Sequence, residues 1–332
     1  MQACIYNEYG DADRVKVGEM ATPAPRAGEV LVRVHAASVT TADWRFRSAT
    51  FPAGFRFAGR LMLGVLRPRN PVLGMDFAGV VEAVGAGVTR FRPGDRVFGS
   101  TSPNRRGAHA EYVVVDAEGA ITHTPASLRD DAAAAVPFGA NCALAFLRDI
   151  ARVEPGQRVL VVGASGGVGI WAVQLARHLG AEVTAVCSGR NAELVRSLGA
   201  HHVVDYTTGS IAPEGAVYDV IFDTVGGTSF AACRPFLSAR GVYLPLENDV
   251  GDIVEALLVS RSNGKKMLTK ISGNTREGLE TIASLIAAGV LEPVVDRVYP
   301  MAHIADAHRH VEGRHKRGSV VISMLGDSRH DP

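Results

Sequence analysis

Residues 158–179 constrain the fold of this chain more than any other segment. A short apolar run at 158–163 leads into a glycine-rich turn that matches A-x-G-x-x-G at 164–169, and an apolar helical pattern follows at once. A strand that turns through glycines into a helix is the setting of a dinucleotide-binding motif; an ordinary tight turn is the alternative. We expect Gly166 to let the backbone approach a pyrophosphate, and Gly169 to let the helix pack closely on the strand.

The start of that helix is expected to hold the phosphates. The first N–H groups of a helix have no partner inside it, and the positive end of the helix dipole lies there. The anion would then contact Ser165, Gly166, Gly167 and Val168. The motif begins with Ala164, where the common pattern has glycine.

Strand and helix patterns alternate through the middle of the chain, which predicts an α/β fold with a doubly wound parallel sheet. The first ~120 residues instead show short strands separated by Gly and Pro, as in a small β-barrel, and short strands return after residue 289. We therefore predict a barrel domain at 1–124, completed by 289–332, and a Rossmann domain at 125–288. The predicted strands of the Rossmann domain are 158–163, 182–187, 202–205, 218–223, 241–245 and 267–271, with helices at 168–179 and 191–198 among them.

The composition is typical of a globular protein, and the net charge limits the classes of partner that we expect. The apolar fraction is 47%, the charged fraction 21% and the net charge +1, so nothing points to nucleic acid or to a membrane surface. The arginine-rich stretch at 56–69 is the local exception. The four cysteines form no C-x-x-C pair, and we see neither a signal peptide nor an apolar run of about 18 residues, the length that would span a membrane. We expect a cytoplasmic protein.

The end of the second strand indicates which dinucleotide binds. For NAD, an acidic residue about 20 residues past the glycines usually binds the ribose 2′-hydroxyl. Here the strand at 182–187 is followed by Ser188, Gly189 and Arg190, with no acid. Ser188 can donate a hydrogen bond, Arg190 carries a charge suited to phosphate, and Tyr206 after the next strand adds a hydroxyl. We predict NADPH, although Arg190 also fits a solvated side chain and Tyr206 a packing residue.

Six segments of the chain occur in the order and spacing of a known family: 73–81, 92–97, 107–112, 163–169, 223–227 and 317–322. Together they resemble the medium-chain dehydrogenase/reductase superfamily, specifically its zinc-free quinone oxidoreductase-like branch. The resemblance implies a GroES-like catalytic domain interrupted by a cofactor domain, with the active site in the cleft between them. It also implies a homodimer that pairs edge strands, for which residues 266–271 are the candidate.

The zinc-dependent relatives place Cys, His and Glu around a catalytic metal. At the matching positions this chain has threonines at 40–41, Met75 with Asp76, and Phe138 with Gly139. Hydroxyl and thioether groups supply neither the thiolate nor the imidazole that Zn²⁺ prefers. The four-cysteine lobe of those relatives is also missing from the sequence. We predict that the chain uses no metal.

Hydride transfer without a metal favours a substrate that is already polarised. Quinones and α,β-unsaturated carbonyls fit, because the added charge spreads onto oxygen. The resemblance places three candidate catalytic residues near the reacting groups: Thr40 would hydrogen-bond the substrate or the nicotinamide ribose, and Asp43 would hold the loop through an ion pair with Arg47. Many quinone reductases have Asn at the position of Thr40 and Tyr near Arg45, and both are missing here. Reduction of aldehydes or ketones, and a non-enzymatic NADPH-binding role, stay open.

The resemblance also places residues near the nicotinamide half of the cofactor. Val225 and Gly226, after the fourth strand of the sheet, would pass the ring, and Leu244 and its neighbours, after the fifth strand, would flank the carboxamide. Asn141 would lie near the ribose or phosphate, and Arg317 or Ser319 would reach back from the C-terminal end. Loop packing is the alternative for each. Residues 55–66 are too apolar for a bare surface loop, and we hypothesise a flap over an apolar substrate pocket, with packing against a partner subunit or the barrel as the alternative.

Overall fold

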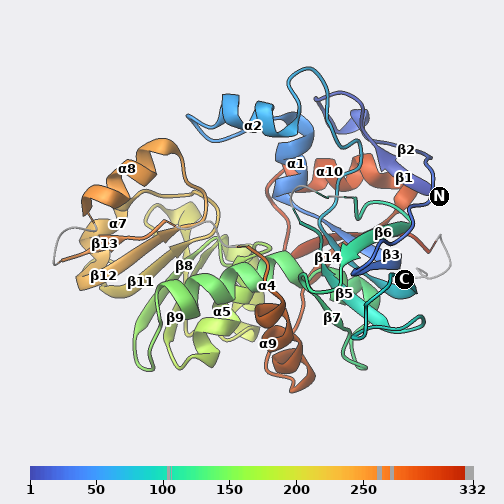
Figure 1. The fold of residues 1–332 in the computed structure, drawn as a ribbon. Coiled ribbons are helices and arrows are strands. Elements are labelled where there is room, and N and C mark those ends of the chain that lie inside the picture. Colours follow the sequence, from blue (N-terminus) through green and yellow to red (C-terminus); the bar gives the residue numbers. More distant parts are fainter. Residues whose placement is uncertain (103–104, 106, 260–263, 270–272, 326–332) are drawn as a thin grey trace. The chain divides into compact units, whose positions relative to one another are not determined.

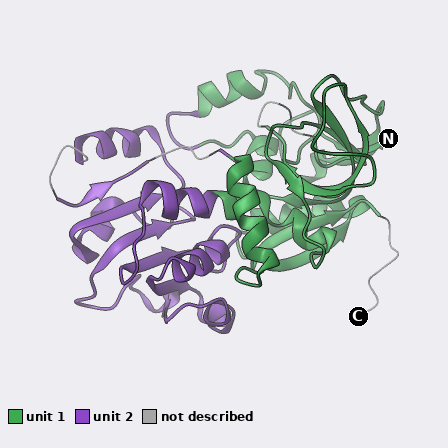
Figure 2. Ribbon diagram, turned by 60° about the horizontal axis from the view of Figure 1, so that its bottom comes forward, with its two compact units in different colours: residues 1–51, 56–141, 274–332 green, residues 52–55, 142–273 purple. Residues whose placement is uncertain are grey.

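The computed structural model describes residues 1–102, 105, 107–259, 264–269 and 273–325. The chain forms two compact units: unit 1 is residues 1–51, 56–141 and 274–332, and unit 2 is residues 52–55 and 142–273 (Figure 2). These limits differ from 124/125 and 288/289. The difference arises because helices just outside the predicted barrel pack on its strands, α3 (Asp130–Ala134) on β3 and β4, and α9 (Arg276–Ala287) on β7.

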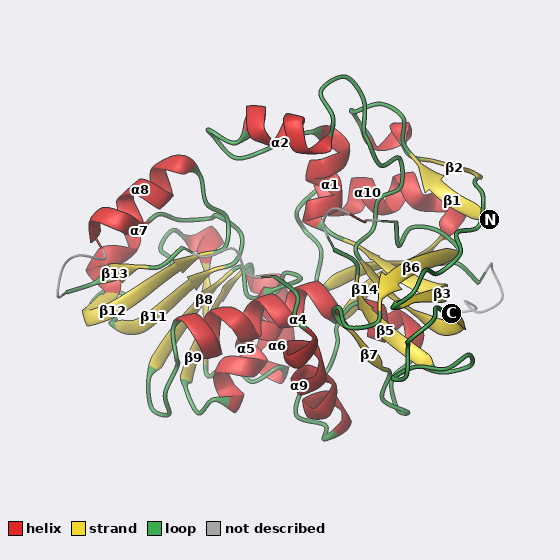
Figure 3. Ribbon diagram, in the orientation of Figure 1, coloured by secondary structure: helices red, strands yellow, loops and turns green. Residues whose placement is uncertain are grey.

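Helices and strands alternate in unit 2, whereas unit 1 is rich in strands (Figure 3). The remaining helices are α1 (Thr41–Ser48), α2 (Arg56–Leu63), α4 (Pro137–Leu144), α5 (Gly169–His178), α6 (Ala192–Ser197), α7 (Phe230–Cys233), α8 (Val250–Val259) and α10 (Ile304–Glu312). The strands are β1 (Gln2–Ile5), β2 (Lys16–Glu19), β3 (Glu29–Val39), β4 (Asp76–Val84), β5 (Arg96–Ser100), β6 (Tyr112–Asp116), β7 (Ile121–His123), β8 (Arg158–Val162), β9 (Glu182–Cys187), β10 (His202–Asp205), β11 (Tyr218–Asp223), β12 (Leu237–Pro245), β13 (Lys266–Met267), β14 (Val295–Pro300) and β15 (Ser319–Ser323).

Unit 2 is built on a parallel sheet in the order β10-β9-β8-β11-β12-β13. Helices α5 and α6 lie on one face of the sheet, and α7 and α8 lie on the other (Figure 3, in the same orientation as Figure 1). The central strand β8 is an apolar run because helices cover both its faces. This arrangement confirms the predicted α/β class and doubly wound sheet. The strand predicted at 267–271 is β13, which is Lys266–Met267 at the edge; residues 270–271 lie outside the described residues.

Unit 1 contains a sheet in the order β14-β15-β3-β4-β5-β7, and β6 also pairs with β3. A separate ribbon joins β1 and β2. The long strand β3 has buried residues along most of its length because three strands pair with it. The C-terminal strand β15 runs antiparallel to β3, with Val320 opposite Val39, so the end of the chain completes the sheet that its beginning starts.

Candidate functional site

The glycine-rich turn joins β8 to α5 in unit 2. The residue that requires glycine for its backbone is Gly163, with φ of +76°, one position before the motif. A Cβ atom on Gly169 would overlap the carbonyl oxygen of Gly163 and lie 2.7 Å from Cα of Ala164. Gly169 therefore allows the close helix–strand packing that the sequence predicted. Ala164, which stands where the common motif has its first glycine, has a fully buried side chain.

The turn leaves several backbone donors unused. The N–H groups of Ser165, Gly167 and Val168 find no acceptor among the described residues. A Cβ atom on Gly166 would meet only the carbonyl oxygen of Gly163, at 3.3 Å, so its outer side is open. The hydroxyl of Ser165 accepts a 2.9 Å hydrogen bond from Nδ2 of buried Asn191, which holds the turn in place. Free N–H groups at a helix N-terminus fit a phosphate.

The prediction of NADPH rests on residues that follow β9 and β10. Ser188 is half-buried and Arg190 is exposed, and neither makes a side-chain hydrogen bond or ion pair within the described part of the chain. Tyr206 is half exposed. These groups are free to bind a ligand, as the sequence analysis required of them.

Asp205 is a carboxylate in this region that the sequence analysis missed. It ends β10 directly opposite Cys187, and a Cβ atom on Gly189 would lie 2.5 Å from its Oδ2. The carboxylate accepts hydrogen bonds from the Thr207 hydroxyl at 2.7 Å and the Thr207 N–H at 2.9 Å, and these bonds lower the pKa of Asp205. Asp205 lies one strand away from the end of β9, where the common motif has its acid. The aligned end of the next parallel strand is the signal that points to it.

The loop after β11 is held by Asp223, which the sequence analysis quoted in its motif but did not assign to the site. This fully buried carboxylate accepts hydrogen bonds from the N–H groups of Val225 at 3.0 Å, Gly227 at 3.2 Å and Thr228 at 2.9 Å. The Tyr243 hydroxyl donates to it at 3.3 Å, and burial followed by the charge of Asp223 raises the pKa of Tyr243. The loop is thereby fixed by one side chain.

The same loop lies against the glycine turn. A Cβ atom on Gly163 would be 2.5 Å from Cγ1 of Val225, and Thr224 donates a 2.8 Å hydrogen bond to the carbonyl of Val162. Val225 stays 38% exposed, and Gly226 has φ of +65°. Leu244 was expected beyond the end of its strand, which is wrong. It lies inside β12 opposite Phe222 and is fully buried, and Leu246 is the first residue past the strand with a bond to Asp223, through its N–H and the Asp223 carbonyl.

The segment at 40–47 in unit 1 begins α1 with a capping box. The Thr40 hydroxyl donates to Oδ2 of Asp43 at 2.6 Å and accepts from the Asp43 N–H at 3.3 Å, and the Thr40 N–H donates to the same carboxylate at 2.8 Å. The other carboxylate oxygen accepts from the Gly74 N–H at 2.9 Å. Asp43 therefore ties the helix start to the turn before β4, and it holds the loop as the sequence analysis expected.

The predicted ion pair between Asp43 and Arg47 is wrong. Arg47 is fully buried and pairs through Nη2 with Glu312 of α10 at 2.7 Å. Its Nε and Nη1 atoms have no hydrogen-bond partner among the described residues, and its charge contributes, after burial and His109, to a strongly lowered pKa at His308. Arg47 faces the interior of unit 1, because α1 and α10 pack together there.

Two further residues of unit 1 were expected near the nicotinamide. Asn141 on α4 is buried, and its Nδ2 donor has no partner in the described chain, while Oδ1 lies against Gly278 of α9, where a Cβ atom would overlap it. Arg317 is exposed and makes no ion pair with the described residues, and the Ser319 hydroxyl donates to the Ala135 carbonyl at 3.3 Å. Asn141 and Arg317 thus keep unused donors, whereas the hydroxyl of Ser319 is engaged.

Comparison with known proteins agrees with this geometry. Residues 26–126 match the alcohol dehydrogenase GroES-like domain, and residues 198–322 match the model described as zinc-binding dehydrogenase. The chain is 32% identical to the mouse mitochondrial NAD(P)H oxidoreductase RTN4IP1, over 98% of this chain and 89% of the relative. It is 31% identical to the chloroplastic quinone-oxidoreductase homolog of Spinacia oleracea, over 97% and 98%.

The chain belongs to the medium-chain dehydrogenase/reductase family, in its quinone oxidoreductase-like branch. A solved quinone oxidoreductase from Coxiella burnetii superimposes with a TM-score of 0.86 at 26% identity, covering 98% of this chain and 99% of that one. The predicted family and fold are confirmed, and this dehydrogenase/reductase is an oxidoreductase enzyme. The cytoplasmic location stays a prediction, since the mouse and spinach relatives are named as mitochondrial and chloroplastic.

The positions where zinc-dependent family members hold their metal have other partners in this reductase. Oδ2 of Asp76 accepts from the Phe138 N–H at 3.0 Å and from the Ser38 hydroxyl at 3.3 Å. Burial raises the pKa of Asp76 to about 7. Within the described ranges, no cluster of three His, Cys, Asp or Glu side chains could hold a metal ion. Metal independence stays a prediction, which a zinc analysis of the purified protein tests.

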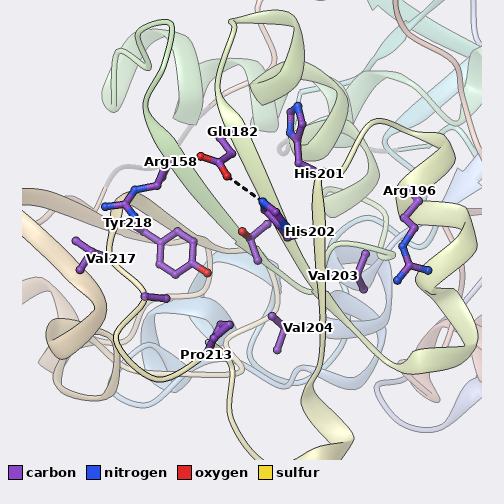
Figure 4. A pocket seen from close by; sticks show the side chains of 12 residues that line it. Arg158, Glu182, Arg196, His201, His202, Val203, Val204, Pro213, Val217 and Tyr218 are labelled. Carbon is purple, nitrogen blue, oxygen red and sulfur yellow. Dashed lines mark hydrogen bonds and ion pairs between the residues drawn. The ribbon is translucent and has the colours of Figure 1, made fainter.

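A cavity of about 490 Å³ opens elsewhere on unit 2 (Figure 4). It lies where the strands begin, beside Arg158, Glu182, His202 and Tyr218, and His202 pairs with Glu182 at 2.9 Å. Ligands of open α/β sheets bind at the other edge, beyond the carboxyl ends of the strands. We therefore assign this cavity no part in cofactor binding.

Among the described helices, none has the length and apolar character to cross a bilayer.

Proposed function

We propose that the chain is an NADPH-dependent reductase of quinones or α,β-unsaturated carbonyls, acting without a metal. The observation that carries the proposal is the glycine turn of unit 2, whose unbonded N–H groups at the start of α5 lie in the same unit as the free side chains of Ser188 and Arg190. Relatives support the substrate class: one is the spinach quinone-oxidoreductase homolog, and another, 30% identical, is the NADPH-dependent alkenal/one oxidoreductase of Arabidopsis thaliana.

The backbone at 165–168 would hold the pyrophosphate. Two observations support this role. The N–H groups of Ser165, Gly167 and Val168 have no acceptor within the described chain, and the outer side of Gly166 is open. Asn191 positions the turn through Ser165. An anion held by such groups gains from the dipole of α5 as well.

Ser188, Arg190 and Tyr206 would bind the 2′-phosphate of NADPH. An exposed, unpaired guanidinium and a free hydroxyl suit a dianionic phosphate. Asp205 opposes this preference, since its carboxylate lies against Gly189 and would repel the phosphate. Asp205 accepts hydrogen bonds from Thr207 and Gly189, and these lower its pKa, so the proposal of NADPH rests on the guanidinium of Arg190, which is unpaired within the described chain.

The nicotinamide, when bound, supplies the hydride. Val225 and Gly226 would face its ring, with Asp223 fixing their loop by three backbone hydrogen bonds. Asn141 offers an unused amide donor to the ribose or phosphate, and Arg317 an unpaired guanidinium. Leu246 and its neighbours take the place beyond β12 that had been expected for Leu244. Thr40 stays at most a hydrogen-bonding residue for the substrate, since its hydroxyl also caps α1.

The test follows NADPH absorbance with a quinone, an enone and an aldehyde in parallel, and repeats each assay with NADH. We expect oxidation with the quinone or the enone, a lower KM for NADPH than for NADH, and no loss of activity after chelation. Activity with the aldehyde alone would identify the carbonyl reductase alternative. A preference for NADH, or loss of turnover with a chelator, would contradict the cofactor and metal parts of the proposal.

We also propose a homodimer that pairs the β13 edges of two copies. Among the described strands, β13 pairs with β12 alone and lies at the edge of the sheet, which leaves backbone groups for a partner strand. Light scattering should give twice the 35.1 kDa mass of one chain. Met267→Pro should shift the mass towards the monomer, and a dimer that persists in this variant would mean that the interface lies elsewhere.

A further inference from the structure

Helix α2 (Arg56–Leu63) exposes an apolar face that a surface helix normally lacks. The exposed fractions on the helix are 82% for Phe57, 53% for Leu61 and 47% for Met62, and just after the helix they are 57% for Val65 and 93% for Leu66. Another side of the helix packs on unit 1 as expected. A Cβ atom on Gly59 would lie 2.5 Å from the ring of Phe51, and Leu63 is 1% exposed. Two apolar sides are therefore present, and the described residues of unit 1 leave one of them exposed.

The charges around this face have one sign. Arg56, Arg67 and Arg69 are exposed, and Arg60 lies with its guanidinium 4.2 Å from the ring centroid of Tyr9. Residues 44–75 contain no Asp or Glu, although the whole chain has a net charge of only +1. The positive charge is thus concentrated beside the exposed apolar side chains.

Helix α8 in unit 2 provides a contrast within the same molecule. It also exposes apolar side chains, including Leu257 at 62% and Leu258 at 64%. Its charged residues are Asp252 and Glu255, and it has no basic residue. Exposure of apolar groups is therefore common to both helices, and only α2 combines it with arginines.

We propose that α2 and residues 64–69 form a docking surface for an anionic lipid bilayer. Apolar side chains entering the acyl boundary, with arginines at the level of the phosphate groups, are the chemistry of helices that lie in a membrane interface. A second copy of the chain fits less well, because a two-fold contact through this face would bring arginines against arginines. The local charge thus modifies the expectation drawn from the net charge, which gave no sign of a membrane partner. If the proposed function is correct, docking would bring the enzyme to quinones dissolved in the bilayer.

The experiment is vesicle flotation of the full chain at low salt. We expect binding to vesicles of phosphatidylcholine with phosphatidylglycerol, and binding at least about tenfold weaker to phosphatidylcholine alone or at high salt. Replacing Phe57, Leu61 and Leu66 together by Ser should reduce binding about tenfold or more. Replacing Arg67 and Arg69 by Gln should reduce it by about tenfold to thirtyfold, from about fivefold for each charge. The control, Leu257→Ser with Leu258→Ser, should bind like the native chain.

Three results would overturn the proposal: no flotation with anionic vesicles, equal flotation with both vesicle types, or unchanged flotation of both α2 variants. Self-association that the serine variant abolishes, without vesicle binding, would identify a second copy as the occupant. Thermal unfolding and NADPH binding are measured for every variant. If the serine variant does not fold, the variant at Arg67 and Arg69, which are exposed charges, carries the test. Flotation without turnover of either a water-soluble quinone or a water-soluble enone would leave docking standing and refute the proposed reaction.

Discussion

The glycine turn at 163–169 and the segment at 40–47 were both predicted to line the site, and they use their polar groups in opposite ways. The turn leaves N–H groups of Ser165, Gly167 and Val168 without acceptors in the described chain. In the segment at 40–47, the side chains of Thr40 and Asp43 form hydrogen bonds within the protein, and the buried Arg47 pairs with Glu312. A residue type that suits a ligand is therefore insufficient evidence; the group must also have spare hydrogen-bonding capacity.

The strongest test of this contrast is Gly169→Ala. The added methyl would overlap the Gly163 carbonyl, so we expect a loss of about 3 kcal/mol in the free energy of unfolding, measured by urea denaturation. Gly166→Ala is the matched control. Its methyl would meet the same oxygen at 3.3 Å, so stability should fall by less than about 1 kcal/mol while NADPH affinity drops. Equal stability of the two variants would refute the packing role of Gly169.

The second test concerns Asp76, a buried carboxylate of unit 1, and its protonation state in the folded protein. Burial raises its pKa to about 7, above the value near 3.8 of the unfolded chain. The native state then keeps a proton that the unfolded state has released, so this group lowers stability as pH rises from about 4 to 7. The Asp76→Asn variant lacks this titrating group. Its free energy of unfolding, compared with that of the native chain at the same pH, should therefore rise by roughly 2–3 kcal/mol between pH 4 and pH 7.

Denaturant midpoints at a series of pH values check this prediction. The control is Asp149→Asn, which changes an exposed carboxylate paired with the adjacent Arg148. Its pH profile should follow that of the native chain. A profile for Asp76→Asn that is parallel to the native one would show that Asp76 ionises normally in the folded protein.

Asp223→Asn probes the loop that faces the turn. The carboxylate accepts three N–H donors and the Tyr243 hydroxyl, and an amide cannot accept all four, so we expect a loss of about 2 kcal/mol in stability and weaker NADPH binding. Tyr243→Phe removes a single donor and should cost about 1 kcal/mol or less. Unchanged nucleotide affinity in Asp223→Asn would show that the loop does not contact the cofactor.

Cofactor choice gives a smaller but directional effect. Arg190→Ala should weaken NADPH binding about tenfold and leave NADH binding unchanged, because a charge-assisted contact to phosphate is lost. Asp205→Asn should act in the opposite direction, raising NADPH affinity severalfold by removing the carboxylate beside Gly189. Fluorescence titration with both dinucleotides measures these changes. A parallel change for both dinucleotides in Arg190→Ala would place Arg190 away from the 2′-phosphate.

Thr40→Ala carries the smallest expected effect. Loss of the capping box should reduce stability by about 1 kcal/mol and kcat by less than about tenfold, and Thr40→Ser should restore both. Unfolding curves and steady-state kinetics separate the two quantities. A fall in kcat of about a hundredfold or more with unchanged stability would mean that the Thr40 hydroxyl does act on the substrate, and the contrast between the two regions would fail.

Sequence patterns predicted the parts of the site that depend on neighbouring residues. The strands β9, β10 and β11 lie at the predicted residues, since apolar runs between turns are local signals. The roles of Asp205 and Asp223 were missed because each depends on the register of parallel strands, with Asp205 opposite Cys187 and Asp223 opposite Val162. Leu244 lies inside the strand that the sequence pattern itself predicted at 241–245, and its misplacement beyond that strand came with the family resemblance.

By itself the sequence determined the strand–glycine–helix unit, the alternation that makes a parallel sheet, and the lack of an acid at the end of β9, because each follows from residues a few positions apart. Only the tertiary structure decided which polar groups stay free. Arg47 meets Glu312 across 265 positions, and Asn141 is left with an unused donor beside α9. The physical reason is that hydrogen-bonding capacity is shared among groups that packing brings together, and packing joins residues whose separation in the chain carries no local signal.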